Sequence, residues 1–141
     1  MDTEEPREEM ESVIRQLLIE RQQLLVTFCR AAGVAPGAVT GDEKSVLLHL
    51  CQVLMDYAAL WQFEIHDSLA QGDWGSSRAS AALQTEQPIL MQAAKAMLDF
   101  NDLVDVAVVE GRLMDLDPYL SSLGEVLAER FEAEDRIITA L

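Results

Sequence analysis

Two charged residues lie on the apolar phases of two predicted helices. Arg21 follows Leu17 by four residues, and Glu134 precedes Ile138 by four residues. A charge inside an apolar core is costly unless an opposite charge accompanies it. One interpretation is that Arg21 and Glu134 form a structural ion pair across the interior. The other is that both lie at the edge of an apolar stripe, where their long side chains reach water.

A second group of residues combines apolar side chains with carboxylates on one helix face. In steps of about 100° per residue, a helix over residues 42–70 places on one side His49, Gln52, Asp56, Leu60, Phe63 and Asp67. Leu60 and Phe63 then lie opposite Leu54 and Trp61, which belong to the core-facing side. Apolar groups among acids suit docking to an apolar and basic partner surface. The alternative is that a neighbouring helix or loop covers them.

The residue types that enzymes use are not arranged for catalysis. The chain has two histidines, His49 and His66, and lacks the paired Glu-x-x-His motifs that hold two iron ions in a bundle. Glu64 and His66 are two residues apart and therefore point to different faces of a helix. The sequence shows no Ser-His-Asp arrangement and no Gly-rich loop ahead of a helix. We therefore expect a binding protein rather than an enzyme, with no metal site and no cofactor.

Helices must position these residues. Apolar residues at 3.6-residue spacing predict four helices, over residues 4–32, 42–70, 87–110 and 118–140. The apolar track of the first helix consists of Met10, Ile14, Leu17, Leu18, Leu25, Phe28 and Ala32.

Turn and capping signals separate the four predicted helices. They are Gly33, Val34–Gly37, Thr40, Asp42, Gln71–Asp73, Gly75, Pro88, Gly111, Asp117 and Pro118. A separate helical turn over residues 78–83 is compatible with the pattern, with the third helix beginning at Gln87-Pro88. Long helices joined by short turns pack antiparallel. The sequence thus predicts one all-α domain over residues 1–141, an antiparallel four-helix bundle with short connecting turns.

The charge of the chain points to the kind of partner. The formal net charge is −15, from 25 acidic residues against 10 Lys and Arg. Such a surface repels nucleic acid and anionic lipid and attracts basic proteins, although the charge could serve solubility alone. The acidic segment Met1–Met10 is unlike a signal peptide, and no apolar run approaches the ~20 residues that cross a bilayer. We expect a cytoplasmic protein, more readily a monomer than an oligomer, that binds neither nucleic acid nor membrane.

Two segments in the first half of the chain carry family-like motifs. The first is Glu20–Val26 followed by Gly33–Gly37, which is similar to R-x-x-L-L followed by G-[IV]-x-P-G. The second is Leu50–Tyr57 continuing to Phe63–Ile65, which is similar to F-C-Q-x-L-V-D-Y-x-S-x-G-H-F-x-x-Y-E.

A third segment completes the pattern near the C-terminal end. Leu123–Phe131 with Glu134 and Asp135 is similar to I-G-E-x-L-E-x-R-F-x-x-E-D. The three segments occur in order and span about residues 13 to 138. With these motifs the chain resembles the regulator of sigma D (Rsd/AlgQ) family of bacterial anti-sigma factors.

The chain departs from the family pattern at several positions. Arg15–Leu18 stands where the family has D-R-W-L, and Ala59, Trp61 and Gln62 replace its Ser, Gly and His. The family's Y-E becomes His66 and Asp67. Most of these departures fall in the helix that carries the candidate docking residues, so the fold is inherited more securely than an identical partner.

The resemblance implies a function and a site. It implies an anti-sigma factor that binds the primary RNA polymerase sigma factor, notably its basic C-terminal domain that reads the −35 promoter element, and reduces its use by core polymerase. Asp56, Phe63 and Glu64 fall in the family signature, and helical spacing adds Leu60 and Asp67 to this partner-binding set. The alternative is an acidic helical adaptor or sensor that binds a different metabolic or stringent-response regulator.

Overall fold

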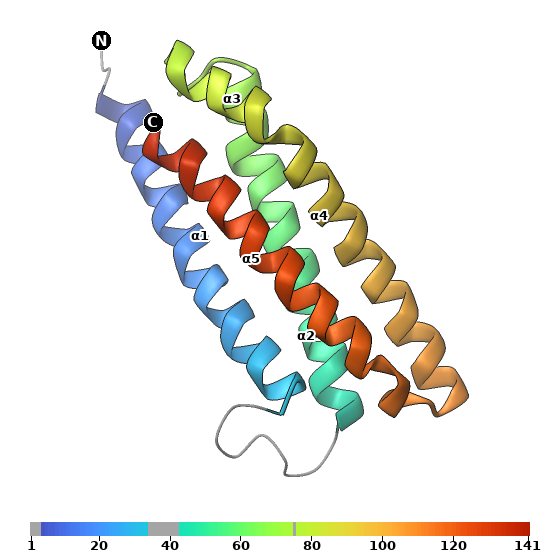
Figure 1. The fold of residues 1–141 in the computed structure, drawn as a ribbon. Coiled ribbons are helices and arrows are strands. Elements are labelled where there is room, and N and C mark those ends of the chain that lie inside the picture. The colour runs from blue at the N-terminus through green and yellow to red at the C-terminus, as the bar shows by residue number, and fades with distance from the viewer. Residues whose placement is uncertain (1–3, 34–42, 75) are drawn as a thin grey trace.

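Four helical rods lie side by side in the computed structural model, which describes residues 4–33, 43–74 and 76–141 (Figure 1). The elements are α1 (Glu4–Ala31), α2 (Glu43–Leu60), η1 (Trp61–His66), α3 (Asp67–Ala70), α4 (Ser77–Glu110), η2 (Leu113–Leu116) and α5 (Asp117–Thr139). Successive rods run in opposite directions, so the start of α1 and the end of α5 lie at the same end of the bundle. None of the described residues forms a strand. The predicted all-α, antiparallel four-helix bundle is confirmed.

The core consists of apolar side chains that all four rods turn inward. The largest fully buried apolar side chains are Leu17, Leu24, Leu50, Leu54, Tyr57, Ile65, Met97, Val104, Leu127 and Ile137. The rods formed by α1 and α5 also approach each other closely, because a Cβ added to Gly124 would lie 2.9 Å from Cζ of Phe28.

The second rod is continuous but changes its helical type. Residues 43–70 are helical throughout, as predicted, and η1 within them is a π-helix. The backbone N–H of Asp67 donates to the carbonyl of Gln62, five residues earlier. Because a π-turn holds more residues than an α-turn, positions after η1 do not follow the 100° steps assumed from sequence. The predicted direction of Asp67, which follows the π-helix, therefore changes, whereas that of Asp56, which precedes it, does not.

The third rod begins ten residues earlier than predicted. α4 begins at Ser77, with the side chain of Ser76 accepting a hydrogen bond from the N–H of Ala79 at 3.1 Å. The prediction of a start at Gln87-Pro88 is therefore wrong, and Pro88 lies inside the helix. Pro88 is exposed, so the backbone carbonyl that loses its donor can face water. The buried positions Ala79, Leu83, Glu86 and Leu90 already continue one helical stripe.

The first helix buries a different set of leucines from the predicted track. Leu17 and Leu24 are fully buried, whereas Leu18 is 46% exposed and Leu25 is 43% exposed. The sequence has two Leu-Leu pairs seven residues apart, and this repeat fits either of two neighbouring phases. In the structure, Leu17 and Leu24 face the interior, and Arg21 faces inward with them. Leu18 and Leu25 therefore contribute to the surface rather than to the core.

The predicted helix boundaries at the remaining turns have mixed outcomes. Gly111 ends α4 in the left-handed conformation (φ 68°), as predicted for a terminating glycine. Asp117 is the first residue of α5 and not its cap, because η2 leads into the helix through the buried residue Leu116. The turn signals at residues 34–42 and at Gly75 lie outside the described residues.

One rod has an apolar character that the sequence expectation overlooked. Among the described residues, Glu43–Ala70 is long and apolar enough, by length and composition, to cross a membrane. One side of this rod supplies Leu50, Leu54 and Tyr57 to the centre of the core. A core helix of a bundle passes the same test of length and composition, so the finding is weak support for a membrane span.

Candidate functional site

Glu134 is the centre of a polar group inside the bundle. Its side chain is fully buried, and its Oε1 accepts hydrogen bonds from Arg21 Nη2 at 3.0 Å and from the Tyr57 hydroxyl. Its Oε2 accepts from Arg130 Nε at 2.8 Å. The donors come from α1, α2 and α5, so this single carboxylate joins three helices. Such pairing offsets the cost of burying the charge.

Arg21 makes further contacts that fix its position. Nη1 lies 2.7 Å from Asp135 Oδ1, and Nε donates to the Tyr57 hydroxyl at 3.2 Å. The guanidinium also lies 4.8 Å from the ring centre of Phe131, a cation–π distance. We call Arg21, Tyr57, Arg130, Glu134 and Asp135 the ion cluster.

The ion cluster shifts the protonation equilibria of two of its members. Burial alone would lower the pKa of Arg21, but Tyr57, Asp135 and Glu134 outweigh it and raise that pKa. Burial raises the pKa of Tyr57, and the nearby Glu134 carboxylate raises it further despite the opposing effect of Arg21. Tyr57 therefore keeps its proton and remains a donor to Glu134.

The three segments that resemble the family meet at this point. Arg21 comes from the first segment, Tyr57 from the second, and Arg130 and Glu134 from the third. The structure brings together Arg21 and Glu134, which sequence reasoning paired. That reasoning missed Arg130, although its position four residues before Glu134 places it on the same helix phase. Helical spacing places Tyr57 on the same side of its helix as Leu54 and Trp61, but spacing does not show what its hydroxyl contacts.

The predicted partner-binding residues divide into two groups. Asp56, Phe63 and Glu64 are exposed, with Phe63 at 67%. We call these three residues the docking surface, after the partner binding that the sequence predicts for them. Leu60 is partly buried and packs against the core, so its predicted place among outward-facing residues is only partly correct.

Asp67 belongs to a separate polar group after the π-helix. Its Oδ1 accepts from Gln62 Nε2 at 3.2 Å and lies 3.4 Å from His66 Nδ1. Gln62 Nε2 also lies 3.2 Å from His66 Nδ1. The carboxylate of Asp67 is therefore in contact with two side chains and is only partly exposed. The carboxylate of Asp56 is exposed and accepts a hydrogen bond from the exposed Gln52 Nε2 at 3.0 Å.

A hollow between α1 and α2 lies near the docking surface. Its lining mixes the apolar Ile19, Val26 and Val53 with the polar Gln22, Gln23, Thr27, Arg30 and His49. Exposed apolar side chains lie beside it on α1, and two of them, Leu18 and Leu25, were predicted to be in the core. The exposed side chains are Leu18, Ile19, Leu25 and Val26, each between 43% and 49% exposed. Val53 precedes Asp56 by three residues, so the hollow and the docking surface are neighbours on α2.

The described residues offer little for metal or thiol chemistry. No group of three or more His, Cys, Asp or Glu among them lies close enough to hold a metal ion. Cys29 and Cys51 are both free, and Cys51 is buried. Burial, with a contribution from Asp105, raises the pKa of the Cys51 thiol to about 11, which disfavours the reactive thiolate.

Comparisons with known proteins identify the family. Residues 2–141 match the family described as "Regulator of RNA polymerase sigma(70) subunit, Rsd/AlgQ". The chain is 30% identical over 130 residues to "Regulator of sigma D" of Yersinia enterocolitica, covering 89% of this chain and 78% of that protein. The protein of the same name from Pectobacterium carotovorum is 28% identical over 131 residues, with 90% and 86% covered. No solved structure matches the chain. The chain therefore belongs to the Rsd/AlgQ family of regulators of the RNA polymerase sigma(70) subunit.

Proposed function

We propose that this protein is an anti-sigma factor that binds the basic C-terminal domain of the primary sigma factor through the docking surface. The observation that carries the proposal is Phe63, an aromatic side chain that is 67% exposed beside the carboxylates of Asp56 and Glu64. The curated relatives are named for sigma D, and the family for the sigma(70) subunit, which supports a sigma factor as the partner.

The charge of the chain supports the same class of partner. A protein domain that reads promoter DNA needs a basic surface, because it must neutralise phosphates. An acidic bundle with net charge −15 attracts that surface over distance and accelerates the encounter. The exposed ring of Phe63 would then supply the apolar contact that keeps the complex together.

Occupying this domain would give regulation without catalysis. A sigma domain covered by the bundle cannot contact the −35 element, so core polymerase uses that sigma factor less. In this proposal the protein acts as a monomer in the cytoplasm, where RNA polymerase works, and touches neither DNA nor membrane. It needs neither a cofactor nor a metal ion.

The test is a kinetic binding series with the full chain and the isolated C-terminal domain of the primary sigma factor. Surface plasmon resonance at about 0.05 M and about 0.3 M salt should show slower association at the higher salt, because screening shortens the range of attraction. Phe63→Ala should speed dissociation by about tenfold or more, as expected for an aromatic anchor. Asp56→Asn should mainly slow association.

Matched variants elsewhere on the surface separate a local effect from a general one. Tyr119→Ala removes an aromatic side chain that is 47% exposed on α5, and Asp102→Asn removes an exposed acid on α4. Both should bind like the parent. If Phe63→Ala and Asp56→Asn also bind like the parent, the docking surface is not the site. If the parent itself fails to bind, the chain serves another regulator as an acidic adaptor.

A further inference from the structure

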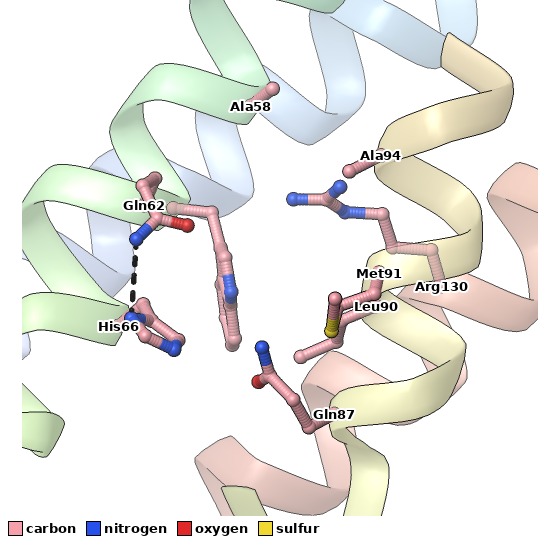
Figure 2. Close-up of a pocket in the computed structure, with 9 residues that line it drawn as sticks. Ala58, Gln62, His66, Gln87, Leu90, Met91, Ala94 and Arg130 are labelled. Atoms are coloured by element: carbon pink, nitrogen blue, oxygen red, sulfur yellow. Dashed lines mark hydrogen bonds between the residues drawn. The ribbon is translucent and has the colours of Figure 1, made fainter. Parts of the chain in front are cut away.

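A second hollow lies on the other side of η1, against α4. It has a volume of about 190 Å³. Figure 2 shows Arg130 reaching into it, with Gln62 and His66 on one side and Gln87 and Met91 on the other. This hollow contains neither Phe63 nor Glu64, so it is separate from the docking surface.

Arg130 brings unused hydrogen-bond donors to this hollow. An arginine has five N–H donors. Nε donates to Glu134, and Nη1 has only the sulfur of Met97, at 3.5 Å. Among the residues that the structure describes, no oxygen accepts from the other three N–H groups, although the Arg130 side chain is 3% exposed. These free donors face the hollow, where water or the acceptor of a bound molecule can satisfy them, and a charged acceptor forms the stronger hydrogen bond.

The pairing within the ion cluster points to the same edge of Arg130. The cluster is neutral overall, with Arg21 bonded to Asp135 and Glu134 and Arg130 bonded to Glu134. Glu134 contacts Arg130 only through Nε, so the Nη edge of the guanidinium has no carboxylate partner among the described residues. That edge reaches into the hollow.

The rest of the wall is mostly apolar. Gln87 also lines the hollow, but its Oε1, which is buried without a hydrogen-bond partner in the described part of the chain, is an acceptor and does not bind an anion. Most other lining side chains are apolar, among them Trp61, Leu90 and Ala94. One cationic end with apolar walls is the pattern of a site for a small organic anion.

We propose that the hollow between η1 and α4 binds a small monocarboxylate, with its carboxylate on Arg130 and a short apolar body against Trp61, Leu90 and Ala94. A planar guanidinium matches a carboxylate in geometry as well as in charge. A cavity of about 150 Å³ can hold benzene, so a hollow of about 190 Å³ has room for a molecule of butyrate's size. The residues of this site do not overlap the docking surface, so the proposal does not depend on the sigma-factor proposal.

The test is an NMR titration of the full, isotope-labelled chain with sodium butyrate, butyramide and inorganic phosphate. Butyrate should shift the Trp61 indole N–H and the Arg130 Nε–H saturably, with a dissociation constant on the order of 1 mM for so small a ligand. Butyramide, which lacks the charge, should bind about tenfold more weakly or worse. Phosphate, which lacks an apolar body, should also bind more weakly.

Variants that fill the hollow complete the test without disturbing the ion cluster. Ala94→Leu should abolish the butyrate response, and Ala58→Val, which narrows the hollow from the α2 side, should weaken it. Ala81→Leu, at an exposed position of α4 outside the hollow, should bind like the parent. Circular dichroism checks the fold of each. The proposal is overturned if butyrate gives no saturable shift, if phosphate binds as tightly, or if both folded filling variants still bind.

Discussion

The ion cluster and the docking surface both depend on charged residues, but the bundle holds them in opposite ways. Glu134 is fully buried and bonded to residues of three helices, whereas Asp56 is exposed and its hydrogen-bond donor is Gln52 on its own helix. The buried group can be satisfied only by protein atoms, while the exposed group is satisfied by water until a partner arrives. Changes in the ion cluster should therefore affect folding, and changes on the docking surface should affect binding.

Glu134→Ala should have the largest effect on folding. It leaves the guanidiniums of Arg130 and Arg21, 3% and 12% exposed, without their shared carboxylate. Breaking a buried pair in this way typically costs about 3–5 kcal/mol, because an uncompensated charge stays buried. Urea unfolding at pH 7 measures the loss as a lower midpoint at unchanged slope. A loss below about 1 kcal/mol would mean that water reaches the arginines and that the ion cluster is not a buried network.

Arg21→Ala should cost less, about 2–3 kcal/mol, because Glu134 keeps Arg130 and Tyr57 as donors. The same urea experiment measures it. The triple change Arg21→Met, Arg130→Met and Glu134→Leu removes the three interior charges of the ion cluster and should recover most of the loss seen in Glu134→Ala. The double change without Arg130→Met should recover less, because Arg130 would remain without its carboxylate. Equal recovery in the double and triple variants would contradict the role given to Arg130.

The sequence predicts part of the ion cluster but not all of it. Arg21 and Glu134 were identifiable because a charge on an apolar phase stands out against its neighbours. Arg130 carries the same signal and could have been found. The hydroxyl contact of Tyr57 could not, because spacing shows that a ring faces inward but not which carboxylate its oxygen meets.

The helix boundaries and phases show a second limit. Proline favours the first turn of a helix, so Pro88 predicts a helix start, yet the buried stripe from Ala79 to Leu90 continues past it. The π-helix η1 has no sequence signal that we could identify, and it changes the direction of Asp67. In α1 the paired leucines fit two phases, and only packing against the other helices selects Leu17 and Leu24. Local patterns thus predicted the fold but not the details of each surface.

Tyr57→Phe should have a smaller effect, about 1 kcal/mol at pH 7, from the lost hydrogen bond to Glu134. It should also change the response to alkali. Because the pKa of Tyr57 is raised in the folded state, its contribution to stability is present below pH 10 and is lost as the pH rises further. Urea midpoints from pH 8 to pH 11 should therefore fall less steeply in Tyr57→Phe than in the parent. Parallel curves would show that Tyr57 is not the group that titrates.

Phe63→Ala should have the smallest effect on folding and still change function. Its ring is 67% exposed, so removing it forfeits little buried area, and the free energy of unfolding should change by less than about 0.5 kcal/mol. The same should hold for Asp56→Asn. A cost above about 1.5 kcal/mol for Phe63→Ala would mean that the ring packs against the bundle. Phe63 would then contribute to folding, as the residues of the ion cluster do. Urea unfolding and sigma-domain binding measured on one preparation make the comparison direct. A variant that folds like the parent but releases the partner faster assigns Phe63 to recognition, because a side chain needed by the bundle could not be removed at so small a cost.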